Sequence, residues 1–161
     1  FEVNNFELLN YCKSNFKTIF ISTGTANKEE IIALHNFFKN WDGELIVMHC
    51  VSSYPCEPNN INLPRINHLR DFFNNVGFSD HTQGIFSAIS SIYLKPKAIE
   101  KHFTTDHELP GRDNKFAILP HEMKELRSFI EIFESSMKDH GIEYQNIELS
   151  SREEYRGRFN G

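Results

Sequence analysis

Two histidines in this sequence are spaced so that they can hold a metal ion. Four apolar runs read as strands, each followed by a helix-like segment: 18–22, 45–50, 76–81 and 98–103. His81 and His102 end the third and fourth runs. Because neighbouring parallel strands lie about 4.8 Å apart, two imidazoles at equivalent depth can share one divalent ion. We therefore predict a metal site at His81 and His102, with hydrogen bonding at the strand ends as the alternative.

Small hydroxyl side chains gather at the same predicted edge of the sheet. They lie within or directly after the ends of the first three apolar runs: Ser22, Thr23, Ser52, Ser53 and Ser79. Together with the N–H groups of turns, such hydroxyls can bind phosphate oxygens. Each one taken singly is also a common turn or cap residue. No P-loop and no Gly-x-Ser-x-Gly motif occurs, so the sequence does not favour an NTPase or a serine hydrolase.

Charged residues beside the two histidines allow two interpretations. Asp80 and Glu100 are adjacent to the predicted ligands, and a carboxylate in that place commonly orients a ligating histidine. A structural ion pair with Lys101 is an equal alternative. Lys101 is otherwise the only cation among the strand ends. His49 ends the second run, where it is either a third ligand or, as we favour, a packed core residue.

The elements that must position these residues form an α/β fold. Near-continuous apolar strands are typical of parallel sheets covered on both faces, and a strand spacing of about 25–30 residues fits βαβ units. Asn27 and Glu30 have the spacing of a capping box, which predicts a helix beginning there. Four units resemble half of a (β/α)8 barrel, which typically takes about 250 residues. We expect the chain to cover four to five units of such a barrel.

Composition narrows the classes of protein. The 161 residues carry a net charge of −5 with no basic run, so we expect no nucleic-acid partner. No apolar stretch approaches the roughly 18 residues that span a bilayer, so we expect no membrane partner. Three cysteines without a Cys-x-x-Cys pair argue against a disulfide framework or a structural zinc site. A reducing cytoplasmic location fits best.

Taken together, the motifs resemble those of the sialic acid synthase (N-acetylneuraminate synthase) family. The resemblance covers about residues 1–140 and rests on an ordered series: Ser22-Thr-Gly, His49-Cys-Val-Ser-Ser-Tyr-Pro, Gly77-Phe-Ser-Asp-His-Thr, Glu100-Lys-His-Phe-Thr and Pro110-Gly-Arg-Asp113. It implies a TIM barrel that condenses phosphoenolpyruvate with an N-acetylated aminosugar aldehyde such as N-acetylmannosamine. The expected products are a nine-carbon ulosonic acid and phosphate. Synthases of legionaminic or pseudaminic acid, and a non-catalytic half-barrel, are the alternatives.

The resemblance also implies roles for individual residues. His81 and His102 match the ligands of a divalent cofactor, Mn²⁺ or Mg²⁺. Ser22 and Ser79 match residues that hold phosphoenolpyruvate, and Ser52 stands where some members have Asn. Two further residues match substrate contacts: Tyr54 lies near the substrates, and Asp113 binds hydroxyls of the acceptor sugar.

The match begins near the fourth strand of the family's barrel, so we expect this chain to be its C-terminal half. The first strands of the family carry a glutamate and lysines that contact the substrates, and these are not found here. We expect residues 1–150 to be the partial barrel and 151–161 a tail or linker. The full-length protein is expected to be a homodimer, and the isolated chain to be inactive.

Overall fold

A computed structural model describes residues 2–158 of the chain. The chain divides into two compact units, residues 1–130 and 131–161. The strands and the helices of more than three residues, in chain order, are α1 (Phe6–Asn15), β1 (Thr18–Ser22), α2 (Lys28–Phe38), β2 (Glu44–Cys50), α3 (Arg65–Arg70), β3 (Val76–Asp80), α4 (Phe86–Ile92), β4 (Ile99–Lys101), α5 (Pro120–Ser136) and α6 (Leu149–Tyr155).

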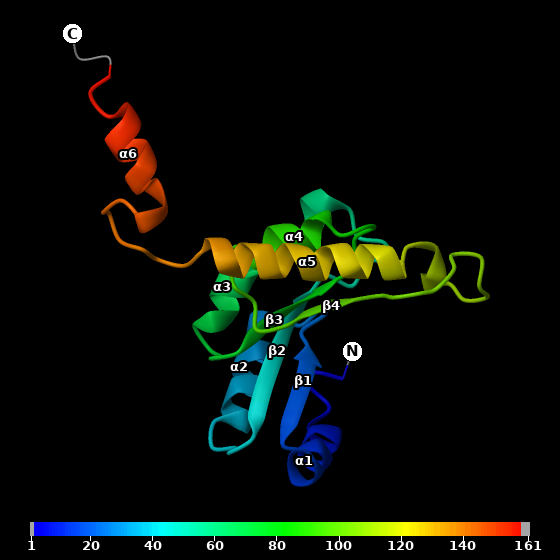
Figure 1. The fold of residues 1–161 in the computed structure, drawn as a ribbon. Helices are drawn as coiled ribbons and strands as arrows, with labels where there is room; N and C mark the ends of the chain where they lie inside the picture. The colour runs from blue at the N-terminus through cyan, green and yellow to red at the C-terminus, as the bar shows by residue number, and fades with distance from the viewer. Residues whose placement is uncertain (1, 159–161) are drawn as a thin grey trace. The chain divides into compact units, whose positions relative to one another are not determined.

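The four strands form one parallel sheet in the order β1-β2-β3-β4 (Figure 1). Each strand pairs with its neighbours in sequence, and each crossover between strands contains a helix. The prediction of four parallel strands is therefore confirmed. The fourth is shorter than predicted, Ile99–Lys101 in place of 98–103, because the chain leaves the ladder at His102 and Phe103 bridges to Ile118 instead.

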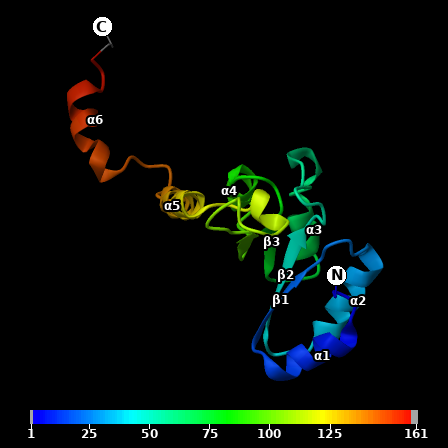
Figure 2. The same ribbon diagram turned by 90° about the vertical axis from the view of Figure 1, so that its right-hand side faces the viewer.

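One face of the sheet carries the main hydrophobic core. Apolar side chains from alternate strand positions, such as Ile21, Val47 and Phe78, pack there with Leu34 of α2 and Ile66 of α3. Figure 2 shows α2 and α3 on this one side of the curved sheet. Burial of this layer supplies the main stabilisation of the unit, at roughly 25 cal/mol per Å² of apolar surface.

The opposite face of the sheet carries the side chains of the alternate strand positions, which point away from this core. Phe20 of β1 is 54% exposed there, whereas Met48 of β2 is buried. Met48 lies over Gly77 of β3, where an added Cβ would overlap the methionine sulfur. The register places Ser22, Met48 and Gly77 in one row, so Ser79 and Glu100 belong to this face as well.

The start of α2 agrees with its sequence signature. The Asn27 side chain accepts a hydrogen bond from the Glu30 N–H, and the Glu30 carboxylate accepts one from the Asn27 N–H, both at 2.9 Å. This capping box satisfies two N–H groups at the helix start. The predicted helix start is therefore confirmed.

The second unit, residues 131–161, contains the end of α5, a turn of 3₁₀ helix at Asn146–Glu148 and α6. The Arg152 guanidinium lies 4.3 Å from the centre of the Tyr144 ring. The assignment of 151–161 as a tail or linker stays a prediction. No helix in the described part of the chain is long and apolar enough to cross a membrane.

Candidate active site

Three of the predicted site residues meet where β2, β3 and β4 end. The His81 and His102 rings have centroids 5.3 Å apart, and the Tyr54 ring lies 4.3 Å from His81 and 6.0 Å from His102. His81 directly follows β3 and His102 directly follows β4. The pairing of β3 with β4 thus brings together residues that are far apart in the sequence.

The backbone fixes which nitrogen of His81 faces the site. Its Nδ1 lies 2.8 Å from the Val51 carbonyl oxygen, which can only accept a hydrogen bond. Nδ1 therefore carries the proton, and Nε2 of the neutral ring keeps its lone pair. The Cys56 N–H donates to the His81 carbonyl at 2.9 Å, which ties the loop after β2 to the end of β3. This arrangement is the usual preparation of a histidine that binds a metal through Nε2.

His102 is positioned by longer contacts than His81. Its Nδ1 lies 3.6 Å from the Asp113 carboxylate, and its ring packs on Phe116 with centroids 5.2 Å apart. Burial lowers the pKa of His102, and the neighbouring His81 lowers it further. A lowered pKa keeps the imidazole neutral, which is the form that binds metals.

Ser79 links the histidine pair to Glu100 of β4. It is 2% exposed, and its hydroxyl donates to the Glu100 carboxylate at 2.5 Å. The same oxygen lies 3.5 Å from Nε2 of His81. Glu100 is directed to Ser79 and therefore does not orient either histidine. The groups beside the histidine Nδ1 atoms are the Val51 carbonyl at 2.8 Å and the Asp113 carboxylate at 3.6 Å.

Asp80 and Lys101 form the ion pair that was one of the two sequence alternatives. Their charged atoms are 3.1 Å apart, and the side chains are 0% and 2% exposed. Lys101 also donates to the Thr82 carbonyl at 2.6 Å, and the Thr82 N–H donates to Asp80 at 2.8 Å. Burial lowers the pKa of Lys101, while Asp80 opposes that effect. Lys101 is therefore a structural cation, and the predicted alternative of an ion pair with Asp80 is confirmed.

His49 is a core residue, as favoured from the sequence. It is fully buried, stacks on Phe78 at 5.7 Å, and its Nε2 lies 2.7 Å from the Ile61 carbonyl. Its Nδ1 has no hydrogen-bond partner among the described residues. Burial lowers the pKa of His49.

Ser52 lies in the loop after β2, and Ser22 is the last residue of β1. An added Cβ on Gly24 would lie 3.2 Å from the Ser52 hydroxyl, and Gly24 has a φ of +51°. Glycine at this position therefore lets the loop after β1 approach the loop after β2. Ser22 lies on the same face as Ser79 but two strands away, so the structure does not bring these two hydroxyls into contact.

Three features of the site were not predicted from the sequence. They are the Phe116 ring, which contacts both His102 and Tyr54, the Val51 carbonyl, and the cis peptide bond between Tyr54 and Pro55. Phe116 lies in an irregular segment, where no periodicity marks a contact residue. Of the three, only the cis peptide bond had a signal in the sequence, namely the Tyr-Pro dipeptide, because cis peptide bonds are almost confined to proline.

The donor set fits a divalent ion with few protein ligands. Within residues 2–158, no group of three or more His, Cys, Asp or Glu side chains is placed to hold a metal. Two neutral imidazoles leave the other coordination positions of an ion open to water or substrate. Beside them lie a hydroxyl, a carboxylate and an aromatic ring, which can bind a polar organic substrate.

Among known protein families, one matches most of this chain. The NeuB family model matches residues 1–141. The chain belongs to the NeuB family. Among curated proteins it is similar to the N,N'-diacetyllegionaminic acid synthase of Campylobacter jejuni, with 37% identity over 86% of this chain and 42% of that protein. The N-acetylneuraminate-9-phosphate synthase of Drosophila melanogaster is 33% identical over 84% of this chain and 37% of that protein.

Solved structures of NeuB relatives agree with the fold. The sialic acid synthetase of Leptospira borgpetersenii matches with a TM-score of 0.81 and 30% identity, over 96% of this chain and 56% of the other. The four parallel strands are therefore a half-barrel of the kind found in that structure. The chain spans about two fifths of the length of the curated relatives that it matches.

Proposed function

We propose that this NeuB-family chain contributes half of the active site of a phosphoenolpyruvate-dependent nonulosonic acid synthase. The observation that carries the proposal is the pair His81 and His102, which present prepared imidazoles at the ends of adjacent strands, with Tyr54 beside them. In the proposed reaction a carbon–carbon bond forms between phosphoenolpyruvate and an N-acetylated aminosugar aldehyde. Water adds to C2, and the C–O bond to phosphate breaks.

His81 and His102 would hold the divalent cofactor, Mn²⁺ or Mg²⁺. A bound ion of this kind supplies Lewis-acid polarisation of an oxygen and lowers the pKa of bound water. The protein's own contribution is the orientation of the two rings. The Val51 carbonyl holds the proton of His81 on Nδ1, and Asp113 with Phe116 positions His102.

The serines and Asp113 would bind the two substrates. Ser79, Ser52 and Ser22 are proposed to contact phosphoenolpyruvate, and Asp113 the hydroxyls of the acceptor sugar, with Tyr54 packing beside the reactants. Because Lys101 is engaged by Asp80, it does not neutralise the phosphate. We propose that the other half of the barrel supplies those cations, that this chain is the C-terminal half, and that the whole enzyme is a cytoplasmic homodimer.

For the acceptor sugar, we propose three candidates in the order in which they should be tested. N-acetylmannosamine is the first acceptor to test, because an N-acetylneuraminate product follows from the sequence resemblance. The C. jejuni legionaminic acid synthase at 37% identity and a C. jejuni pseudaminic acid synthase at 30% make their acceptors the second and third choices. A non-catalytic half-barrel is the alternative of a different class.

The test measures phosphate release from phosphoenolpyruvate by the full-length protein, with each N-acetylated aminosugar in turn, with and without Mn²⁺. His81→Ala and His102→Ala are compared with His68→Ala, an exposed histidine on α3. We expect metal-dependent release that both site variants lose and His68→Ala keeps. Release with another aminosugar only would change the acceptor. No release with any aminosugar would refute the synthase and leave the half-barrel as a binding module.

A further inference from the structure

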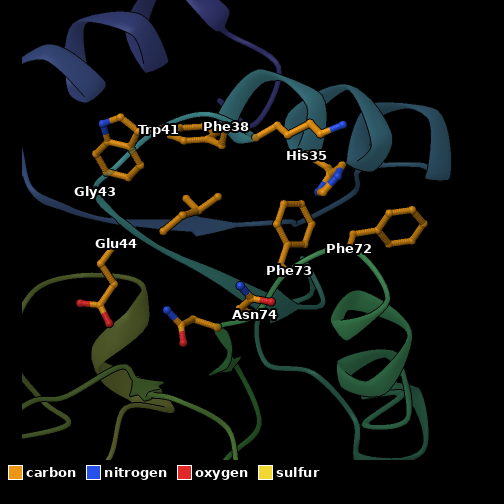
Figure 3. Close-up of a pocket in the computed structure, with 11 residues that line it drawn as sticks. His35, Phe38, Trp41, Gly43, Glu44, Phe72, Phe73 and Asn74 are labelled. Carbon is orange, nitrogen blue, oxygen red and sulfur yellow. The ribbon is translucent and has the colours of Figure 1, made fainter.

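A second pocket lies at the opposite end of the strands from the histidine pair. It has a volume of about 280 Å³ and lies between the end of α2, the start of β2 and the loop that leads into β3. Figure 3 shows Trp41 and Glu44 at one end of this pocket and His35 and Phe73 at the other. Its size is close to the lower limit of ligand-binding pockets, roughly 300–1,000 Å³. All of its lining in this chain comes from residues 35–75.

The walls of the pocket are aromatic. Phe38 and Trp41 pack edge to face with centroids 5.4 Å apart, and His35 packs in the same way on Phe73 at 5.8 Å. The Trp41 indole N–H donates to the Lys13 carbonyl at 3.2 Å, which fixes the ring. Phe38 and Phe73 are buried, so the accessible aromatic surface comes from the half-buried rings of Trp41 and Phe72, which can stack on a planar ligand.

The polar side chains around these walls include amides, a cation and a carboxylate. The side-chain amides of Asn74 and Asn75 and the ammonium of Lys39 form no hydrogen bond to another described residue, although all three line the pocket. Lys39 is the C-cap residue of α2 and keeps helical backbone angles four residues after His35, so the two side chains lie on the same side of the helix end. Glu44 contributes a half-buried carboxylate whose closest cation, Lys97, is 3.7 Å away.

We propose that this pocket binds a nucleoside 5′-monophosphate. The aromatic walls suit the base, and the two amides suit the donors and acceptors on its edge. Lys39 and His35 suit the phosphate, and the Glu44 carboxylate suits the ribose hydroxyls. A simple anion leaves the aromatic walls and the carboxylate unused, and a purely apolar ligand leaves both amides and Lys39 unused. This binding is independent of the proposed condensation, because none of its residues belongs to the histidine site.

The test titrates the full-length protein with adenosine and cytidine 5′-monophosphate, by calorimetry and by tryptophan fluorescence, with Trp41→Phe as the reference that isolates the Trp41 signal. Each titration is repeated with the matching nucleoside, with inorganic phosphate and with phenylalanine. Lys39→Met removes the proposed phosphate contact and Asn74→Ala a base contact; both side chains are exposed, so folding is retained. Lys28→Met, at the first position of the same helix, is the matched control.

We expect saturable binding of at least one nucleotide with a Kd below about 1 mM, with a change in Trp41 fluorescence. Lys39→Met should weaken the nucleotide about tenfold and leave the nucleoside unchanged, Asn74→Ala should weaken both, and Lys28→Met neither. The proposal is overturned if neither nucleotide binds, if phenylalanine or phosphate alone binds as well as the nucleotides, or if neither pocket variant changes the affinity. Loss of nucleotide binding in His81→Ala would also overturn it, by placing the ligand at the other site.

Discussion

The ion pair between Asp80 and Lys101 allows a quantitative test of how the end of β3 is held. Both side chains are almost completely buried, and together they bind the backbone N–H and carbonyl of Thr82. Removing one partner of a buried pair leaves the other charge without compensation, which costs about 3–5 kcal/mol. Replacing both partners removes that cost.

The perturbation is a double-mutant cycle of Asp80→Asn, Lys101→Met and the two combined. Asn can still accept the Thr82 N–H, so Asp80→Asn removes mainly the charge. Lys101→Met keeps the length of the side chain but also removes the donor to the Thr82 carbonyl, a loss of about 1 kcal/mol that the double variant keeps. We therefore expect each single variant to lose about 3–5 kcal/mol and the double variant only about 1–2 kcal/mol.

The assay is thermal unfolding of the full-length protein followed by circular dichroism. A domain of this size loses about 2–4 °C in Tm per kcal/mol, so the single variants should melt roughly 6–20 °C lower. The Asp80→Asn variant should also gain stability as pH rises toward 10.4, since the folded state then holds Lys101 neutral while the unfolded chain still binds the proton. If the double variant is as unstable as the sum of the two single variants, the charges are not coupled and the reasoning fails.

Three further predictions concern single positions. His49 and His102 both have a lowered pKa in the folded state, so the unfolded chain binds their protons first as pH falls below about 6.5, and each group removes stability at up to about 1.4 kcal/mol per pH unit. In pH-dependent unfolding, His49→Gln should remove the His49 share of that slope, whereas His68→Gln should leave the slope unchanged. Gly77→Ala should cost about 1–3 kcal/mol in denaturant unfolding, because its Cβ would overlap the Met48 sulfur and lie 2.9 Å from the Ala98 carbonyl; an unchanged midpoint would show that the strands shift freely. Asn27→Ala should cost about 1 kcal/mol by loss of the capping box, whereas an equal loss in Lys28→Ala would show that the effect is not specific to the cap.

The fold could be predicted from the sequence because its signals are local. Apolar runs separated by helical segments identify parallel βα units without any knowledge of distant contacts, and Asn27 with Glu30 marks one helix start directly. The end of the fourth strand was predicted at 103, but the strand ends at Lys101. Phe103 pairs with Ile118 instead, and that pairing depends on an irregular loop.

The site was predictable only in part, for the same reason. The positions of His81 and His102 follow from the ends of adjacent strands, so their proximity needed only the strand order. The partners of Glu100 and Lys101 depend on which face of the sheet each side chain occupies. Alternation along β4 puts Lys101 on the face of Asp80 and Glu100 on that of Ser79, and this register was not fixed by the sequence.

The pairing of each strand only with its neighbours in sequence has a consequence for biosynthesis. As the chain leaves the ribosome, β2 finds β1 already present, and the same holds for β3 and β4. Each addition closes a loop of similar length, so no step waits for a distant partner and the entropic cost per step stays nearly constant. This half-barrel can therefore assemble strand by strand during translation, with its registers set in the order in which they are made.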